Sequence, residues 1–145
     1  MQIKRRIIRS QLAATPINPE PEKQLALVAD DDWVSREVVC AILERQGYEC
    51  IRAKSGHETR ALLYRHHPGL MILDLNMPLG GGLDVLSTLK QAPPQKPVKT
   101  MILTGSSDTE DIQLAASLGA TNYMTKPLVT AEFITRIHAM EAAAS

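Results

Sequence analysis

The sequence has no long hydrophobic run. Its longest apolar stretches, such as residues 25–29 and 70–73, span only four or five positions. A helix that crosses a bilayer needs about 20 consecutive apolar residues. The N-terminus also lacks the hydrophobic segment of a secretory signal. We therefore expect a chain that neither spans a membrane nor enters the secretory route.

Cysteine is scarce and net charge is absent. Cys40 and Cys50 form no metal-binding or redox motif, so they are interpreted as small apolar residues in or near the core of a reduced, cytoplasmic protein. The formal net charge is zero, with 16 basic and 16 acidic residues. Without an overall field, the sequence gives no reason to expect binding to nucleic acid or to anionic lipid.

Residues 1–24 differ from the rest of the chain. They hold five Lys or Arg against two Glu, and three prolines fall within residues 15–23. Prolines at this spacing favour an extended linker. We expect a basic N-terminal arm and a proline-rich linker over 1–24, followed by one domain over 25–142. A frayed arm is favoured over a docking helix or a targeting signal.

From residue 25 the pattern alternates between strand and helix five times. Each short apolar run is followed by an amphipathic segment. Serines at helix starts have the capping-box spacing, Ser55 with Glu58 and Ser107 with Glu110, and Thr130 is the expected cap of the last helix. Glycines 80–82 are interpreted as a flexible turn before the third helix. The strands are predicted at 25–29, 48–53, 70–73, 98–103 and 122–125.

Five consecutive β-α units predict an α/β fold, a doubly wound five-stranded parallel sheet with five helices, of the flavodoxin-like kind. Functional residues of such sheets lie at the carboxyl ends of the strands. Asp30 and Asp31 follow the first predicted strand, and Asp74 follows the third. Thr104 follows the fourth strand and Lys126 the fifth.

Clustered carboxylates need a cation, because their charges repel one another. Lys126 alone cannot balance three aspartates. Oxygen ligands without His or Cys favour Mg²⁺ or Mn²⁺ over zinc. A nucleotide site is disfavoured, since the turn after the first strand is acidic and glycines 80–82 lack the Lys-Ser/Thr of a phosphate-binding loop.

Four motifs occur in order: Val-Ala-Asp-Asp-Asp at 28–32, Ile-Leu-Asp-Leu-Asn-Met-Pro at 72–78, Ile-Leu-Thr-Gly-Ser at 102–106 and Tyr-Met-Thr-Lys-Pro-Leu at 123–128. The spacings are 43 residues from Asp31 to Asp74, 30 to Thr104 and 22 to Lys126. Over residues 25–142 the chain resembles the CheY-like receiver domains of bacterial two-component response regulators.

The resemblance implies a phosphorelay function. Asp74 would take a phosphoryl group from the phospho-histidine of a histidine kinase or a histidine phosphotransfer protein. Asp31 and Asp74 would bind Mg²⁺ directly, with the backbone carbonyl of Asn76 as a third ligand. Asp30 would act on the ion through water.

The resemblance also implies a switch. Lys126 would pair with Asp74 at rest and with a phosphoryl oxygen afterwards, and its bond to Pro127 is a candidate cis peptide. Thr104 would bond to the phosphoryl group, and Tyr123 would swing inward. The surface of about residues 108–141 would then control a downstream target or a tethered output domain, or form a homodimer.

Two other functions stay open at this point. A pseudo-receiver would bind partners without phosphorylation, although the acidic, hydroxyl and lysine set is complete. A magnesium-dependent aspartyl phosphatase would need a second aspartate two residues after Asp74, where the chain has Asn76. The domain is expected to be a stand-alone receiver or a piece of a larger regulator, and the basic arm with its linker favours the piece.

Overall fold

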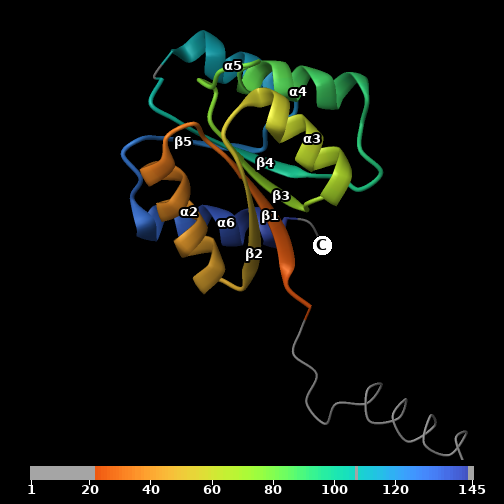
Figure 1. Ribbon diagram of the computed structural model, residues 1–145. Helices are drawn as coiled ribbons and strands as arrows, with labels where there is room; N and C mark the ends of the chain where they lie inside the picture. The colour runs from red at the N-terminus through yellow and green to blue at the C-terminus, as the bar shows by residue number, and fades with distance from the viewer. Residues whose placement is uncertain (1–21, 107, 144–145) are drawn as a thin grey trace, which may run out of the picture.

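The computed structural model describes residues 22–106 and 108–143. A five-stranded parallel sheet runs through the centre in the order β2-β1-β3-β4-β5 (Figure 1). The predicted arm and linker lie outside the described residues, apart from residues 22–24. The strands are β1 (Gln24–Ala29), β2 (Tyr48–Ala53), β3 (Leu70–Leu73), β4 (Lys99–Thr104) and β5 (Asn122–Thr125).

Helices cover both faces of the sheet. Two of them, α2 and α6, lie on one face, and α3, α4 and α5 lie on the other (Figure 1). The predicted doubly wound α/β fold is confirmed. The helices are α2 (Trp33–Arg45), α3 (Gly56–His66), α4 (Gly82–Gln91), α5 (Thr109–Ser117) and α6 (Thr130–Ala142).

The core consists of two apolar layers, one on each side of the sheet. Ala26 and Val28 of β1 face the layer that includes Phe133 of α6, whereas Leu27 between them faces the layer that includes Leu86 of α4. Neighbouring residues of β1 therefore point to opposite faces of the sheet, and both faces are buried. This is why the strands read as continuous apolar runs rather than as an alternating pattern.

Side-chain caps begin two helices, and the one at Ser55 was predicted from the sequence. The Ser55 hydroxyl accepts a hydrogen bond from the backbone N–H of Glu58 at 3.1 Å at the start of α3. At the start of α2, the Asp32 carboxylate accepts one from Ser35 at 3.1 Å. Each cap satisfies an N–H group that the helix itself leaves without a partner.

Two predicted caps are wrong. Asp108, not Ser107, is the N-cap of α5, and its carboxylate accepts from the N–H of Glu110 at 3.0 Å. Ser107 lies outside the described residues. The last helix begins at Thr130 itself, after an extended N-cap residue, Val129, that makes no side-chain cap bond. A residue already inside the helix cannot occupy the extended cap position.

Strand β4 is shifted by one residue from the predicted 98–103. Lys99 pairs with Leu70 at one end, and Thr104 pairs with Thr125 at the other. Pairing between strands, rather than the apolar run alone, sets these bounds. Among the helices within 22–106 and 108–143, none has both the length and the apolar character of a membrane span.

Candidate functional site

The site is built on backbone that extends the sheet by one residue. The N–H of Asp30 donates to β2 at 3.0 Å, and that of Asp74 donates to β1 at 2.9 Å. The N–H of Lys126 donates to the carbonyl of Thr104 at 2.9 Å. Because these residues continue the parallel ladder, their side chains project from the same carboxyl edge.

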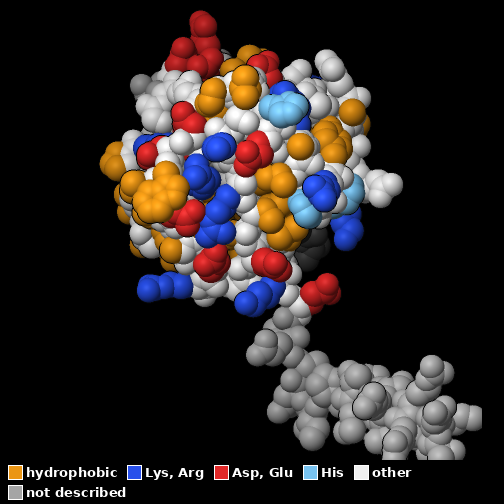
Figure 2. Space-filling view, in the orientation of Figure 1, with side chains coloured by type: hydrophobic (Ala, Val, Ile, Leu, Met, Phe, Trp, Pro, Cys, Tyr) orange, Lys and Arg blue, Asp and Glu red, His pale blue; other side chains and the backbone are white. Residues whose placement is uncertain are grey.

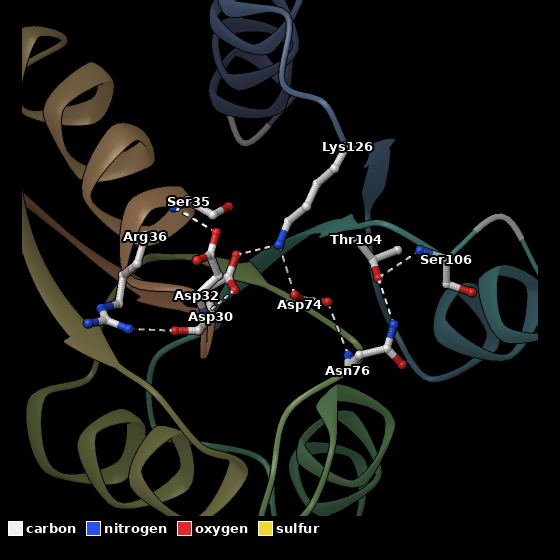
Figure 3. Close-up of polar contacts among 9 residues, drawn as sticks. All are labelled: Asp30, Asp32, Ser35, Arg36, Asp74, Asn76, Thr104, Ser106 and Lys126. Atoms are coloured by element: carbon white, nitrogen blue, oxygen red, sulfur yellow. Dashed lines mark hydrogen bonds and ion pairs between the residues drawn. The ribbon is translucent and has the colours of Figure 1, made fainter.

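Lys126 connects two buried carboxylates. Its Nζ lies 2.7 Å from Oδ2 of Asp30 and 3.0 Å from Oδ2 of Asp74 (Figure 3). The two carboxylate side chains are only 5% and 6% exposed. Burial alone lowers the pKa of Lys126, but the hydrogen bonds to Asp30 and Asp74 outweigh this effect and raise it overall. The ammonium therefore stays charged between the two acids.

A third carboxylate completes the cluster. Oxygen atoms of Asp30, Asp31 and Asp74 lie within 4.8 Å of one another, and Asp31 is exposed to solvent. One ammonium leaves this group with excess negative charge, and all three donors are hard oxygens. The donor set therefore fits a divalent cation such as Mg²⁺ or Mn²⁺.

The Asp74 carboxylate is held at both oxygens. Oδ1 accepts a hydrogen bond from the backbone N–H of Asn76 at 3.0 Å, while Oδ2 faces Lys126. The side-chain amide of Asn76 in turn donates to Oγ1 of Thr104 at 3.5 Å. The loop after β3 is thus tied both to the carboxylate and to the end of β4 (Figure 3).

Thr104 is fully buried, and its hydroxyl oxygen also accepts from the N–H of Ser106 at 3.3 Å. Tyr123 makes none of these contacts: the residue is 46% exposed and lies on the edge strand β5. Its carbonyl accepts a hydrogen bond from Arg136 at 2.7 Å. The structure therefore brings together Asp30, Asp31, Asp74, Asn76, Thr104 and Lys126, with Tyr123 on an outer surface.

Sequence reasoning missed Arg36. Its guanidinium donates to the backbone carbonyl of Asp30 at 2.8 Å, and the N–H of Asp32 donates to Oδ1 of the same residue at 2.9 Å. These two hydrogen bonds from the start of α2 hold the acidic loop, residues 30–32, in place. The signal was the position of Arg36 one turn into the helix that follows the acidic run.

Gly56 packs directly against the loop after β3. The N–H groups of Gly56 and His57 donate to the carbonyls of Pro78 and Leu79 at 3.1 and 3.0 Å. A Cβ on Gly56 would overlap the carbonyl oxygen of Gly80. The stretch interpreted as a flexible turn is therefore a closely packed one, held by the N-terminus of α3.

The Lys126–Pro127 peptide bond is cis, as the sequence suggested. Arg36 and Gly56, in contrast, are supporting residues whose roles appear only once distant segments are assembled. The edge therefore offers a restrained carboxylate beside an ammonium and a group of oxygen donors that fits a divalent cation.

The chain is similar to a known protein family and to several known proteins. The family model of the response regulator receiver domain matches residues 26–138. The phosphate regulon transcriptional regulatory protein PhoB of Klebsiella pneumoniae is 32% identical over 114 residues, covering 79% of this chain and 50% of that protein. The cell cycle transcriptional regulator CtrA of Caulobacter vibrioides is 36% identical, covering 79% and 48%.

A solved structure has the same fold. The signal receiver domain of a response regulator from Bermanella marisrubri is 29% identical, with a TM-score of 0.74, and the match covers 82% of this chain and 98% of that one. The chain spans about half the length of the curated relatives it matches.

Proposed function

The chain belongs to the response regulator receiver family, and on this premise we propose that it accepts a phosphoryl group on Asp74 from a phospho-histidine of a histidine kinase or phosphotransfer protein. One observation carries the proposal. The Asp74 carboxylate is buried yet held by an ammonium at 3.0 Å and a backbone N–H at 3.0 Å, beside two further carboxylates. These contacts orient a carboxylate, a group that can act as a nucleophile and form an acyl phosphate.

In the proposed transfer, a carboxylate oxygen of Asp74 attacks phosphorus, and the bond between phosphorus and the donor's imidazole nitrogen breaks. The product is an acyl phosphate. Lys126, already within hydrogen-bond distance of Oδ2, would move with the charge to a phosphoryl oxygen. No residue here is required to protonate the leaving imidazole nitrogen, because that nitrogen can take up a proton from water.

Asp31, Asp74 and the backbone carbonyl of Asn76 would hold Mg²⁺ or Mn²⁺ directly. When bound, the ion would neutralise the charge that develops on the phosphoryl oxygens. Asp30 would act through water, in keeping with its Oδ2 already paired to Lys126 at 2.7 Å. A separate phosphatase activity is disfavoured, because the amide of Asn76 has no acidic proton for a leaving group.

Phosphorylation would act on the output surface through Thr104. A phosphoryl group carries nearly two negative charges and offers new acceptors. Thr104 would turn its hydroxyl toward that group, and Tyr123 would move inward from the exposed edge strand. The surface formed by α5, β5 and α6, about residues 108–141, would change as a result.

The relatives PhoB and CtrA are named as transcriptional regulators. By analogy we propose that this domain, over 25–142, controls a downstream target or an output domain joined to it, with a homodimer through the α5–β5–α6 surface as one route. The domain would work in the cytoplasm, where histidine kinases present their phosphoryl groups. It is a signalling domain whose own chemistry is limited to gaining and losing one phosphoryl group.

The proposal is tested with a small phosphodonor. Acetyl phosphate with Mg²⁺ should add the mass of one phosphoryl group, and hydroxylamine should remove it, as expected for an acyl phosphate. The Asp74→Asn variant should gain nothing. Asp84→Asn, which alters an exposed carboxylate in the first turn of α4, is the matched control and should label normally. Normal labelling of Asp74→Asn would overturn the assignment.

A further inference from the structure

The two cysteines lie against each other. Cys40 of α2 is completely buried, and Cys50 of β2 is partly exposed. The Cys50 thiol lies 3.8 Å from the backbone carbonyl oxygen of Cys40, so the two residues are in contact. The tight turn after α2 brings these residues face to face although they are ten positions apart. No sequence motif marks such a pair.

A layer of charged side chains covers the pair. Arg52 of β2 bonds to Glu37 at 2.8 Å and to Glu44 at 3.2 Å, and its guanidinium also donates to the carbonyl of Cys50 at 3.4 Å. Glu37, Cys40 and Glu44 stand at i, i+3 and i+7 of α2, on one helix face. The guanidinium therefore spans the face that carries Cys40.

This cover is open to solvent. The side chains of Arg52, Glu37 and Glu44 are 38%, 34% and 49% exposed. Acidic and basic side chains intermingle on the face of the molecule where α2 and β2 lie (Figure 2). Surface ion pairs of this kind contribute little to stability, so their side chains can move apart readily. A molecule as small as hydrogen peroxide can then reach the sulfurs.

The surroundings make one of the two sulfurs the better nucleophile. The hydrogen bond from Cys50 lowers the pKa of Cys40 and burial raises it. The positive charge of Arg52 lowers it and the negative charges of Glu37 and Glu44 raise it, with a lower pKa as the net result. The pKa of Cys50 is raised. Thiolates react with peroxides and thiols do not, so Cys40 is the sulfur that reacts first.

We propose that Cys40 and Cys50 form a peroxide-sensitive thiol pair that closes a disulfide between α2 and β2. The Cys40 thiolate attacks one peroxide oxygen and the O–O bond breaks, giving a sulfenic acid and, after proton uptake, one water molecule. The Cys50 sulfur then attacks the sulfenic sulfur, the S–O bond breaks, and a second water leaves with the Cys50 proton. Both sulfurs are oxidised, and one peroxide is reduced to two waters.

The disulfide would fasten α2 to the neighbouring strand. The first turn of α2 holds the acidic loop through Asp32 and Arg36, so the cross-link would join a redox signal to the helix that supports the site. The proposal does not depend on phosphorylation, because the thiol pair lies outside the carboxylate cluster.

The test uses the full-length reduced protein and hydrogen peroxide. Intact mass should show the loss of two hydrogen atoms in a monomer. After unfolding, iodoacetamide should find no free thiol, and dithiothreitol should restore both. The thermal midpoint of the oxidised form should rise by about 5 °C, since the cross-link restricts the unfolded chain. Disulfide closure should also be faster in the native protein than in the same protein unfolded by urea.

The Cys50→Ser variant is the control for the resolving step. It should gain oxygen atoms at Cys40 and never lose two hydrogens. Two alkylatable thiols in the peroxide-treated parent, oxygen addition without cross-linking, or disulfide-linked dimers would each overturn the proposal. The parent protein alone decides between these outcomes, so the result stands even if the variant folds poorly.

Discussion

The Nζ atom of Lys126 lies 2.7 Å from Oδ2 of Asp30, closer than the 3.0 Å that separates it from Oδ2 of Asp74. The sequence indicated a pair between Lys126 and Asp74 only. A single ammonium in fact pairs with two buried carboxylates, whose residues are 44 positions apart in the sequence. Removing this ammonium should therefore destabilise the carboxyl edge of the sheet.

The first prediction follows from this sharing. Lys126→Met leaves Asp30 and Asp74 buried without their cation and should lower the free energy of unfolding by about 2–3 kcal/mol. Breaking a fully buried pair costs about 3–5 kcal/mol, and Lys126 is partly exposed. Urea unfolding without divalent ions measures the loss. Added Mg²⁺ should restore more stability to the variant than to the parent, because it supplies the missing positive charge.

Lys96→Met is the matched control for this experiment, since Lys96 is an exposed loop residue. Its stability should match the parent within about 0.5 kcal/mol, as for most surface substitutions. If both variants lose equal stability, or if Mg²⁺ rescues neither, the shared ammonium has no special role.

The second prediction concerns Gly56. In Gly56→Ala the new Cβ would overlap the carbonyl oxygen of Gly80, so either α3 or the loop after β3 must shift. We expect a loss of about 1–3 kcal/mol in urea unfolding, typical of overpacking. Gly69→Ala is the control, because no heavy atom lies within 4 Å of a Cβ built there. Equal free energies of unfolding for the two variants would rule out the close contact between Gly56 and the loop after β3.

The third prediction concerns the cation. Trp33 lies two residues beyond Asp31 and is 65% exposed, so its fluorescence should respond when Mg²⁺ binds the acidic cluster. Asp31→Ala should flatten the Mg²⁺ titration. Glu49→Ala, at the amino end of β2 and the opposite edge of the sheet, should leave it unchanged. An unaltered curve for Asp31→Ala would place the ion elsewhere.

The fourth prediction concerns the switch. Thr104→Ala should still accept phosphate at Asp74 but show smaller chemical-shift changes over residues 108–128 on phosphorylation. One hydrogen bond to a charged group contributes roughly 1.5–3 kcal/mol, which corresponds to a roughly ten- to hundredfold change in population. Thr104→Ser keeps the hydroxyl and should retain most of the change. Shifts of equal size in the parent and Thr104→Ala would remove the coupling role.

Much of the fold could be predicted because its pattern is local. The bounds of β2, β3, β5 and α4 were predicted as the structure has them. Where pairing between distant strands sets a boundary, as at Thr104 of β4, hydropathy gave an answer one residue off. Thr104 is polar, yet it is fully buried as the last residue of its strand.

Part of the site could also be predicted, for a different reason. Residues at strand ends converge by topology, so Asp30, Asp74 and Lys126 could be expected at one edge. Supporting contacts could not, because they depend on how separate segments approach. The Gly56 contact with the loop after β3 and the contact of the Cys50 thiol with the Cys40 carbonyl are both of this kind.

The central claim is that Asp74 is the phosphate acceptor, and chemical trapping tests it most directly. The protein is treated with acetyl phosphate and Mg²⁺, then reduced with borohydride, which converts an aspartyl phosphate to homoserine. Peptide mass spectrometry then locates the homoserine. We predict homoserine at position 74, and only after phosphodonor treatment. Homoserine at Asp30, Asp31 or any other aspartate, with position 74 unchanged, would contradict the account.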